Sequence, residues 1–238
     1  MSGHSKWSTI KRKKGAIDAA RGKVFQKLAK ELYVAAKTGD PDPNNNSNLR
    51  MVIEKCKSEN MPKANIETAI AKAMSKGSDE HYDAIRYEGY GPSGIAIMID
   101  CLTDNKNRTA GFVRSALTKR GGNLGTAGSV SYMFERRGLI VLENVYSEDK
   151  IMEDVLDMDI IDVIIDDDIT IYTEPENFLS VKDALDKLGY DKYLISEVTF
   201  IPNNYLSLPD DAKEKVLSLI DELEDIDDVQ AVYHNLEM

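Results

Sequence analysis

The chain has 238 residues, of which 42% are hydrophobic, and its formal net charge at pH 7 is −11. This composition excludes an intrinsically disordered protein, and no apolar run approaches the roughly 20 residues that cross a membrane. The charge is sorted along the chain, since residues 1–30 hold nine Lys or Arg and one acidic residue, whereas residues 137–238 hold seven basic and 27 acidic residues. A basic segment on an acidic body indicates a polyanionic partner.

Residues 1–23 are small, polar and basic with little periodicity, and they predict an extended, flexible arm that leads into a helix. Clustered Lys and Arg release counterions from a polyanion, and an aromatic ring among them can stack on a base. The candidate nucleic-acid contacts in this arm are Lys6, Trp7, Lys11, Arg12, Lys13, Lys14 and Arg21. The alternative interpretation is a solubilising tail that folds back on the acidic part of the chain.

Residues 24–80 have the pattern of a small three-helix domain. Apolar residues recur at helical spacing over 24–38 and 47–58, and Pro62 suits the first turn of a third helix. Lys23, Lys27 and Lys30 are four and three residues apart, so they share one face of the first helix. Lys23 and Lys27 therefore join the candidate nucleic-acid contacts.

From residue 84 onward, strands alternate with helices. The predicted elements are strands over 85–88 and 95–101, a helix over 107–120, a Gly-rich loop or short strand over 121–128, and a strand over 130–134. The helix over 107–120 carries a second basic set, from which Arg108 and Arg114 are candidate nucleic-acid contacts. An ordinary solvated helix face explains the same residues equally well.

Residues 137–205 read as a complete β-α-β-β-α-β unit, the ferredoxin-like arrangement. The preceding stretch lacks one helix and one strand, and both appear after residue 206. We therefore predict an α+β fold with a small N-terminal helical domain and two ferredoxin-like βαββαβ domains, one inserted in the other. The discontinuous domain comprises 81–136 plus 206–238, and the inserted domain is acidic. A simple tandem with an incomplete middle domain is the alternative.

No residue pattern predicts catalysis, a metal or a cofactor. The three histidines lie far apart in the sequence, and the glycines over 121–128 lack the Gly-Lys-Ser/Thr ending of a phosphate loop. Asp166-Asp167-Asp168 reads as a solvated hairpin tip, and the two cysteines read as buried thiols in a cytoplasmic protein. No membrane partner is expected.

Tyr132 and Phe134 alternate onto one face of the predicted strand over 130–134. Single-stranded RNA readers with this element order keep stacking aromatics at such positions. The surrounding residues lack their basic-Gly-aromatic signature, so we favour packing in a core or between domains for both rings.

The arm and the loops together resemble the YebC/PmpR family, and the resemblance spans nearly the whole chain. The N-terminal matches include Gly3-His4-Ser5-Lys6-Trp7, Lys13-Lys14, Asp18, Arg21-Gly22 and Ala64-Asn65-Ile66. Later matches include Tyr87-Glu88-Gly89-Tyr90-Gly91-Pro92, Thr103-Asp104-Asn105, Asn107-Arg108-Thr109, Gly121-Gly122 and Gly128-Ser129-Val130. The chain departs from the family at Ser8-Thr9, often Ala-Asn, and at Tyr132, where many members have Trp.

The resemblance implies a three-domain protein without catalytic activity or cofactor. Family members are described as DNA-binding transcriptional regulators or as translation factors that act on ribosomes at difficult peptide sequences. It also implies that Lys6, Lys11, Arg12, Lys13, Lys14 and Arg21, and less directly Arg108, contact nucleic acid.

Two functions therefore remain open. The first is a DNA-binding transcriptional regulator that uses the basic arm, although the helix over 47–58 offers only Arg50, Lys55 and Lys57 for reading bases. The second is a translation factor that binds ribosomal RNA or the ribosome, for which a flexible basic arm with an aromatic ring is well suited.

Overall fold

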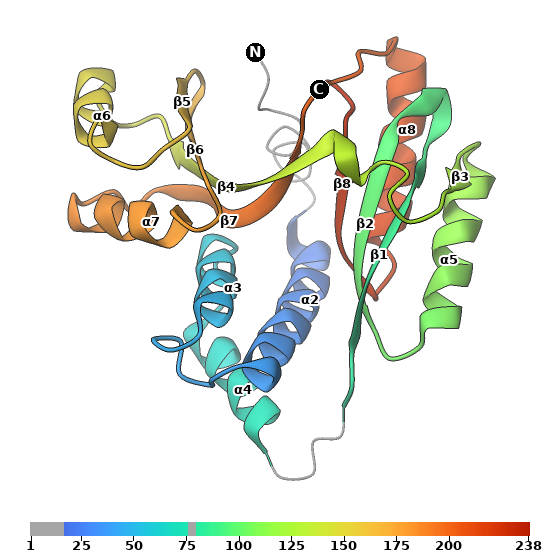
Figure 1. The fold of residues 1–238 in the computed structure, drawn as a ribbon, viewed down its shortest axis with the longest axis horizontal. Helices are drawn as coiled ribbons and strands as arrows, with labels where there is room; N and C mark the ends of the chain where they lie inside the picture. Colours follow the sequence, from blue (N-terminus) through green and yellow to red (C-terminus); the bar gives the residue numbers. More distant parts are fainter. Residues whose placement is uncertain (1–16, 76–79) are drawn as a thin grey trace. The chain divides into compact units, whose positions relative to one another are not determined.

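The computed structural model describes residues 17–75 and 80–238, with side chains from Arg21 onward (Figure 1). Within these residues, an N-terminal helical region precedes two four-stranded sheets, each accompanied by helices. The predicted α+β class with a helical part and two α/β parts is confirmed.

The N-terminal helices are α2 (Ile17–Thr38), α3 (Ser47–Ser58) and α4 (Lys63–Met74). α3 begins where predicted because the Asn46 side chain accepts a hydrogen bond from the backbone N–H of Leu49 at 3.0 Å and caps the helix. α2 begins earlier than predicted, so residues 17–23 are helical and not part of an extended arm. Ala19 and Ala20, the residue type with the highest helix propensity, favour this extension.

The first sheet contains β1 (Asp83–Tyr90), β2 (Ala96–Thr103), β3 (Asn123–Leu124) and β8 (Val229–His234), in the order β3-β1-β2-β8. Its neighbouring strands are antiparallel, and the short turn η2 (Pro92–Gly94) joins β1 to β2. Helices α5 (Lys106–Lys119) and α8 (Asp210–Glu224) share one buried core with β2. Both helices therefore cover the same face of the sheet.

The second sheet contains β4 (Phe134–Glu143), β5 (Asp162–Ile165), β6 (Asp168–Thr173) and β7 (Tyr193–Pro202), in the order β5-β6-β4-β7. Helices α6 (Glu148–Val155) and α7 (Phe178–Lys187) complete the predicted β-α-β-β-α-β order. This whole unit lies in the chain between β3 and β8, which both belong to the first sheet. The second α/β part is therefore inserted in the first, and the tandem alternative is wrong.

The junction between the two sheets differs from the prediction of a strand over 130–134. Residues 131–133 form a 3-10 turn, η3 (Ser131–Met133), and Phe134 begins β4. The backbone N–H groups of Val130 and Ser131 both donate to the Glu88 carboxylate at 2.8 Å, which removes them from any strand ladder. The fourth strand of the first sheet is instead β1, which precedes β2 in the chain. The element order of the first α/β part is therefore ββαβαβ, and the predicted βαββαβ order is wrong for this part.

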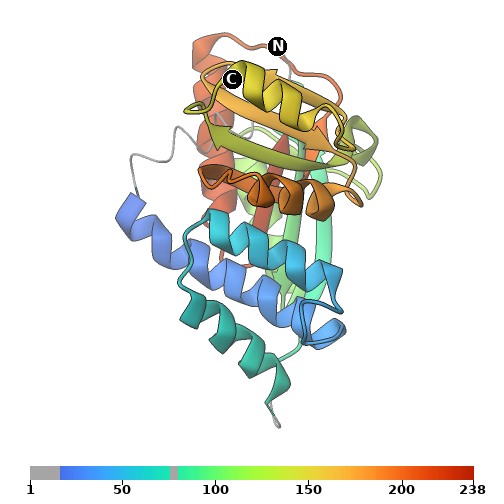
Figure 2. The same cartoon turned by 90° about the vertical axis from the view of Figure 1, so that its left-hand side faces the viewer.

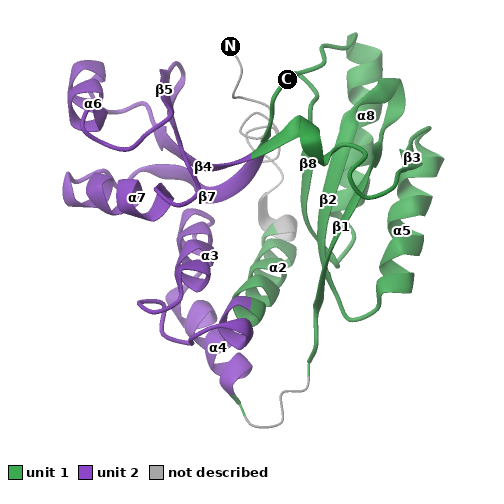
Figure 3. Ribbon diagram, in the orientation of Figure 1, with its two compact units in different colours: residues 1–34, 75–135, 201–238 green, residues 35–74, 136–200 purple. Residues whose placement is uncertain are grey.

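The chain forms two compact units (Figure 3). Unit 1 contains the start of α2 and the first sheet, with residues 1–34, 75–135 and 201–238, and unit 2 contains residues 35–74 and 136–200. α2 therefore contributes to both units. The predicted domain boundaries after residues 23, 80, 136 and 205 stay predictions.

Candidate nucleic-acid interface

The predicted contact residues divide between those that the structure describes and those that it does not. Arg21, Lys23 and Lys27 lie on α2, and Arg108 and Arg114 lie on α5. The remaining predicted contacts precede Ile17 and lie outside the described residues; they are Lys6, Trp7, Lys11, Arg12, Lys13 and Lys14.

The lysines of α2 lie against the C-terminal end of α8, within unit 1. Lys23 Nζ is 3.0 Å from Asp225 Oδ1, and Lys27 Nζ donates to the backbone carbonyl of Glu224 at 2.6 Å. The last carbonyls of a helix lack intrahelical partners and carry partial negative charge, so cations stabilise them. The hydrogen bond to Asp225 and its charge also raise the pKa of Lys23. This lysine face therefore holds α2 on α8, although the Lys23 side chain stays 50% exposed.

Asp228 is the centre of a buried charged cluster next to this contact. Its Oδ2 accepts hydrogen bonds from Arg108 at 2.7 Å and Thr109 Oγ1 at 2.8 Å, and its Oδ1 is 3.4 Å from Lys30 Nζ. Burial by itself would raise the pKa of Asp228, but the Arg108 and Thr109 hydrogen bonds and the Lys30 charge outweigh burial and lower it. Arg108 thus neutralises the buried carboxylate of Asp228. If the Arg108 guanidinium bound a phosphate instead, the Asp228 carboxylate would lose its main partner.

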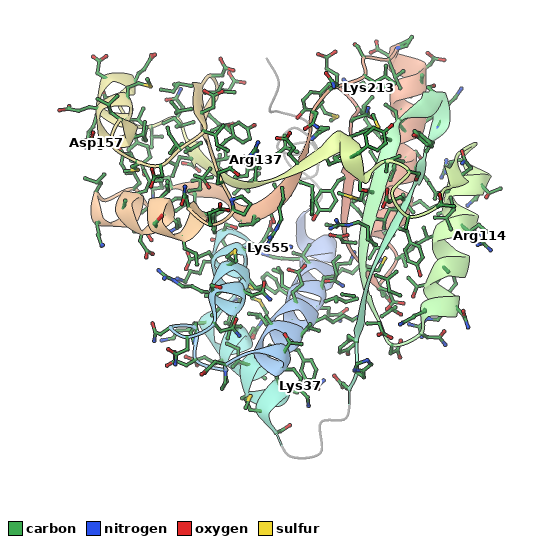
Figure 4. All side chains as sticks on the ribbon, viewed as in Figure 1. Lys37, Lys55, Arg114, Arg137, Asp157 and Lys213 are labelled. Atoms are coloured by element: carbon green, nitrogen blue, oxygen red, sulfur yellow. The ribbon has the colours of Figure 1, made fainter. Side chains whose placement is uncertain are left out.

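The other cations of α5, and Arg120 directly after it, differ in their partners. Lys119 and Arg120 both pair with Glu222 of α8, at 3.1 and 2.8 Å. Arg114 is exposed and makes no hydrogen bond or ion pair with any residue in the part of the chain that the structure describes (Figure 4). Arg114 is therefore better placed than Arg108 to contact a phosphate.

The cations of α3 are engaged inside unit 2, where α3 lies beside α7 (Figures 1 and 2). Arg50 forms an ion pair with Asp183 of α7, and Lys55 Nζ is 3.8 Å from Glu197 Oε2 of β7. These lysine and arginine side chains hold α3 on the second sheet and its helix. They do not form an open row of cations for reading bases in a DNA groove.

A buried lysine completes the contact between α3 and α7. Lys182 is 5% exposed, and its Nζ lies 2.6 Å from Asp186 Oδ2 and 3.4 Å from Glu54 Oε2. The same ammonium lies 4.0 Å from the centre of the Tyr193 ring. Two carboxylates and one ring thus compensate the buried charge, which gives the cluster a structural role.

Glu88 of β1 organises the Gly-rich loop that precedes η3. Its carboxylate is buried and accepts three backbone hydrogen bonds, each 2.8 Å long, from Gly128, Val130 and Ser131. Burial favours a raised pKa, but these hydrogen bonds outweigh it and lower the pKa of Glu88. The negative charge is therefore stable within the loop, and the loop is fixed to β1. No charge or spacing pattern in the sequence indicated this role for Glu88.

The two aromatic residues that we expected to be packed differ in exposure; they are Tyr132 and Phe134. Phe134 is buried, which confirms the prediction for this ring. Tyr132 is 72% exposed, so the packing prediction for Tyr132 is wrong. Because residues 131–133 turn instead of extending, the ring of Tyr132 points away from the core that the strand pattern indicated.

The described residues offer little for catalysis or metal binding. Cys56 and Cys101 are free and buried, and burial raises the pKa of Cys101 to about 12, which keeps its thiol protonated and unreactive. Residues 17–75 and 80–238 contain no group of three metal-ligating side chains, and none of their helices is long and apolar enough to span a membrane.

Comparison with known proteins gives the same assignment over both parts of the chain. Residues 5–76 match the family described as the TACO1/YebC protein N-terminal domain. Residues 82–236 match the family described as the TACO1/YebC second and third domain.

Curated relatives align along their full length. A protein of Lactobacillus gasseri named "Probable transcriptional regulatory protein" is 54% identical and covers 98% of this chain and 97% of its own. The "Probable transcriptional regulatory protein YrbC" of Bacillus subtilis is also 54% identical, over 99% of each chain. These names describe regulators and not enzymes.

A solved structure shares the fold. The crystal structure of the conserved hypothetical protein Aq1575 from Aquifex aeolicus superposes with a TM-score of 0.81 at 41% sequence identity. The match covers 92% of this chain and 91% of the Aquifex chain.

Proposed function

The chain belongs to the TACO1/YebC family, and we propose that it is a non-enzymatic regulator of gene expression that binds DNA through its basic N-terminal segment, residues 1–30. The observation that carries this proposal is the charge segregation, with nine Lys or Arg and one acidic residue in this segment of a chain whose net charge is −11. A compact cluster of cations binds phosphates by counterion release whatever the charge of the remaining protein. The names of the curated relatives favour DNA as the polyanion.

Within this segment, the described cations are not equivalent. Arg21 is exposed, Lys23 is half-exposed beside Asp225, and Lys27 donates to the end of α8. Phosphate binding therefore falls chiefly to Lys6, Lys11, Arg12, Lys13, Lys14 and Arg21, with Lys23 at the margin and Arg114 as a separate contact. Lys27 and Arg108 contribute mainly to the fold.

A second candidate is a translation factor that binds ribosomal RNA or the ribosome. It is favoured by the ion pairs of Arg50 and Lys55, because α3 then presents no free cationic face for the major groove. RNA crevices are recognised through phosphates, shape and single unstacked bases, and this recognition needs no such helix.

The test of phosphate binding replaces Lys11, Arg12, Lys13 and Lys14 together by Ala. Fluorescence anisotropy with labelled duplex DNA and with RNA, at several salt concentrations, should show weaker binding and a salt dependence reduced by up to ~4 log–log units. The matched control replaces the exposed Lys63, Lys187, Lys192 and Lys215 by Ala, because it removes the same charge outside the basic segment. Equal losses in both variants would contradict a specific role for the segment.

The choice between DNA and the ribosome is tested by sedimentation of lysate at moderate salt through a sucrose gradient. Co-migration of the wild type with ribosomes, lost in the four-alanine variant, supports the translation factor. If both proteins stay at the top of the gradient, competition between specific and random DNA sequences becomes the deciding measurement for a transcriptional regulator.

A further inference from the structure

The Tyr132 ring is unusual among the described aromatic side chains because it is exposed and held at the same time. It is 72% exposed, whereas its neighbour along the chain, Phe134, is buried. Burial and the neighbouring Tyr132 raise the pKa of Tyr90, and the Tyr90 hydroxyl donates to the backbone carbonyl of Ser129 in the same loop at 3.1 Å. The loop that carries the ring is thus tied to β1, and most of the ring surface meets the solvent.

The backbone below this ring is fixed by an unusual number of hydrogen bonds to one residue. Glu88 binds three N–H groups of the loop through its carboxylate, and its backbone carbonyl accepts a fourth hydrogen bond from Gly125 at 2.8 Å. Val130 anchors the same loop in the core with a fully buried side chain. A preorganised ring loses little conformational entropy when a ligand binds to it.

The segment of the chain that leads to the ring is rich in basic residues. Residues 105–134 contain five Lys or Arg and no acidic residue, although the chain as a whole has a net charge of −11. The carboxylate that binds this loop from β1, Glu88, is buried and bonded to backbone N–H groups, so it does not face the solvent. Four of these five cations pair with carboxylates outside the segment, and Arg114 is the one without such a pair in the described chain, so it is the cation that an anionic ligand can use.

We infer that Tyr132 is a stacking platform for an unstacked nucleobase of a single-stranded nucleic acid. The inference rests on the proposed nucleic-acid function and adds a contact of a different kind, because base stacking is apolar and insensitive to salt, whereas the basic segment binds phosphates. Single-stranded RNA and single-stranded DNA present the same base faces to such a ring. A duplex keeps its bases stacked and cannot use it.

The experiment compares Tyr132→Ala and Tyr132→Phe by anisotropy with labelled single strands of about ten nucleotides, one of RNA and one of DNA, and with a duplex. Tyr132→Ala should bind the single strands roughly 5- to 150-fold more weakly, with an unchanged salt slope, since a stacked base contributes about 1–3 kcal/mol. Tyr132→Phe keeps the ring and should retain most of the affinity. The single strand, RNA or DNA, whose affinity falls more in Tyr132→Ala is the one whose bases stack on the ring.

A matched control removes an exposed apolar side chain elsewhere, and Leu156→Ala should leave all affinities unchanged because Leu156 belongs to the acidic unit 2. A direct measurement uses a double variant, Trp7→Phe with Tyr132→Trp. Because the chain has one tryptophan, this variant fluoresces from position 132. Single strands should quench the fluorescence of this variant, and the duplex should not.

The outcomes separate this inference from the proposed function. If Tyr132→Ala binds every probe like the wild type while the four-alanine variant loses binding, the stacking platform is overturned and the phosphate contacts stand. If the wild type binds none of the probes, the proposed function fails and the stacking platform fails with it.

Discussion

At the scale of single residues, the carboxylate of Glu88 shows how one charge can define a loop. A buried ion is unfavourable unless hydrogen bonds replace its hydration, and three backbone N–H groups do so here. Gly128 has a φ of 86°, a conformation that L side chains rarely adopt, and it brings the first of these donors to the carboxylate. The loop and the position of Tyr132 therefore depend on this residue.

We expect Glu88→Gln to destabilise the protein by roughly 1–3 kcal/mol, because an amide has only one acceptor oxygen for three converging donors. The folded pKa of Glu88 lies below its ordinary value of 4.5, so its stabilisation is present above that pH and is lost as the pH falls through the folded pKa. Urea unfolding of wild type and variant between neutral pH and about pH 3 measures both effects.

The control for this prediction is Glu176→Gln, since Glu176 is an exposed glutamate and no hydrogen bond joins its carboxylate to another residue of the described chain. The role of Glu88 in fixing the loop would be contradicted if Glu88→Gln were as stable as the wild type at pH 7. It would also be contradicted if Glu88→Gln lost as much stability as the wild type on acidification.

At the scale of elements, α2 and α8 are joined by lysines that meet a helix end. The backbone carbonyl of Glu224 accepts a hydrogen bond from Lys27, and the carboxylate of Asp225 pairs with Lys23. If these lysines bind phosphates as proposed, the acidic segment after α8 competes for the same cations. An exposed pair of this kind contributes about 0–1 kcal/mol, so it limits the availability of Lys23 without removing it.

Asp225→Asn should therefore strengthen binding of nucleic acid by about 1.5- to 5-fold, because it releases Lys23 and removes a negative charge beside it. Asp211→Asn removes the same charge at the opposite end of α8, and we expect a smaller change from it. Titration of both variants by anisotropy at about 0.1 M salt makes the comparison. Equal effects would show that net charge, and not the Lys23 contact, decides the affinity.

At the scale of the whole molecule, the chain forms two compact units, and each unit is built from segments that are separated in the sequence. The last strand of the first sheet, β8, follows the whole second sheet in the chain, and α2 contributes residues to both units. Each sheet nevertheless has its own apolar core. Separate cores indicate that local unfolding follows the units and not the order of the chain.

Gly138→Ala tests this division. An added Cβ at Gly138 would lie 2.1 Å from Thr173 Oγ1 and 2.9 Å from Phe178 Cβ, so the substitution strains the core of unit 2. We expect faster amide hydrogen exchange in residues 35–74 and 136–200, with unchanged exchange in β1 and β2.

Gly111→Ala is the matched control in unit 1, because nothing lies within 4 Å of its added Cβ and Ala is favoured in a helix by roughly 1 kcal/mol. It should slow exchange in α5. If Gly138→Ala accelerates exchange equally in both units, the molecule unfolds as one cooperative body.

The predictable part of the fold follows from local patterns. Asn46 before α3 and the alternating apolar residues of β2 are signals carried by neighbouring residues, and the corresponding helix and strand lie close to their predicted bounds. The insertion of the second sheet was also predictable, because a helix and a strand were missing before residue 137 and present after residue 206. Arg114 was singled out by its charge alone; its side chain is exposed, and its contact with nucleic acid stays a prediction.

The sequence by itself determined the charge segregation, the helical spacing of Lys23, Lys27 and Lys30, and the β-α-β-β-α-β order of the second α/β part, because these depend on residues near each other in the chain. Only the tertiary structure decided that Lys27 and Arg108 serve the fold and that Tyr132 is exposed. Lys27 and Arg108 bond Glu224 and Asp228, which lie 197 and 120 positions away, and Glu88 fixes the turn before Tyr132 through the backbone of Val130, 42 positions away. Hydrogen bonds and ion pairs are short-range in space, and the folded chain sets which distant residues come within that range.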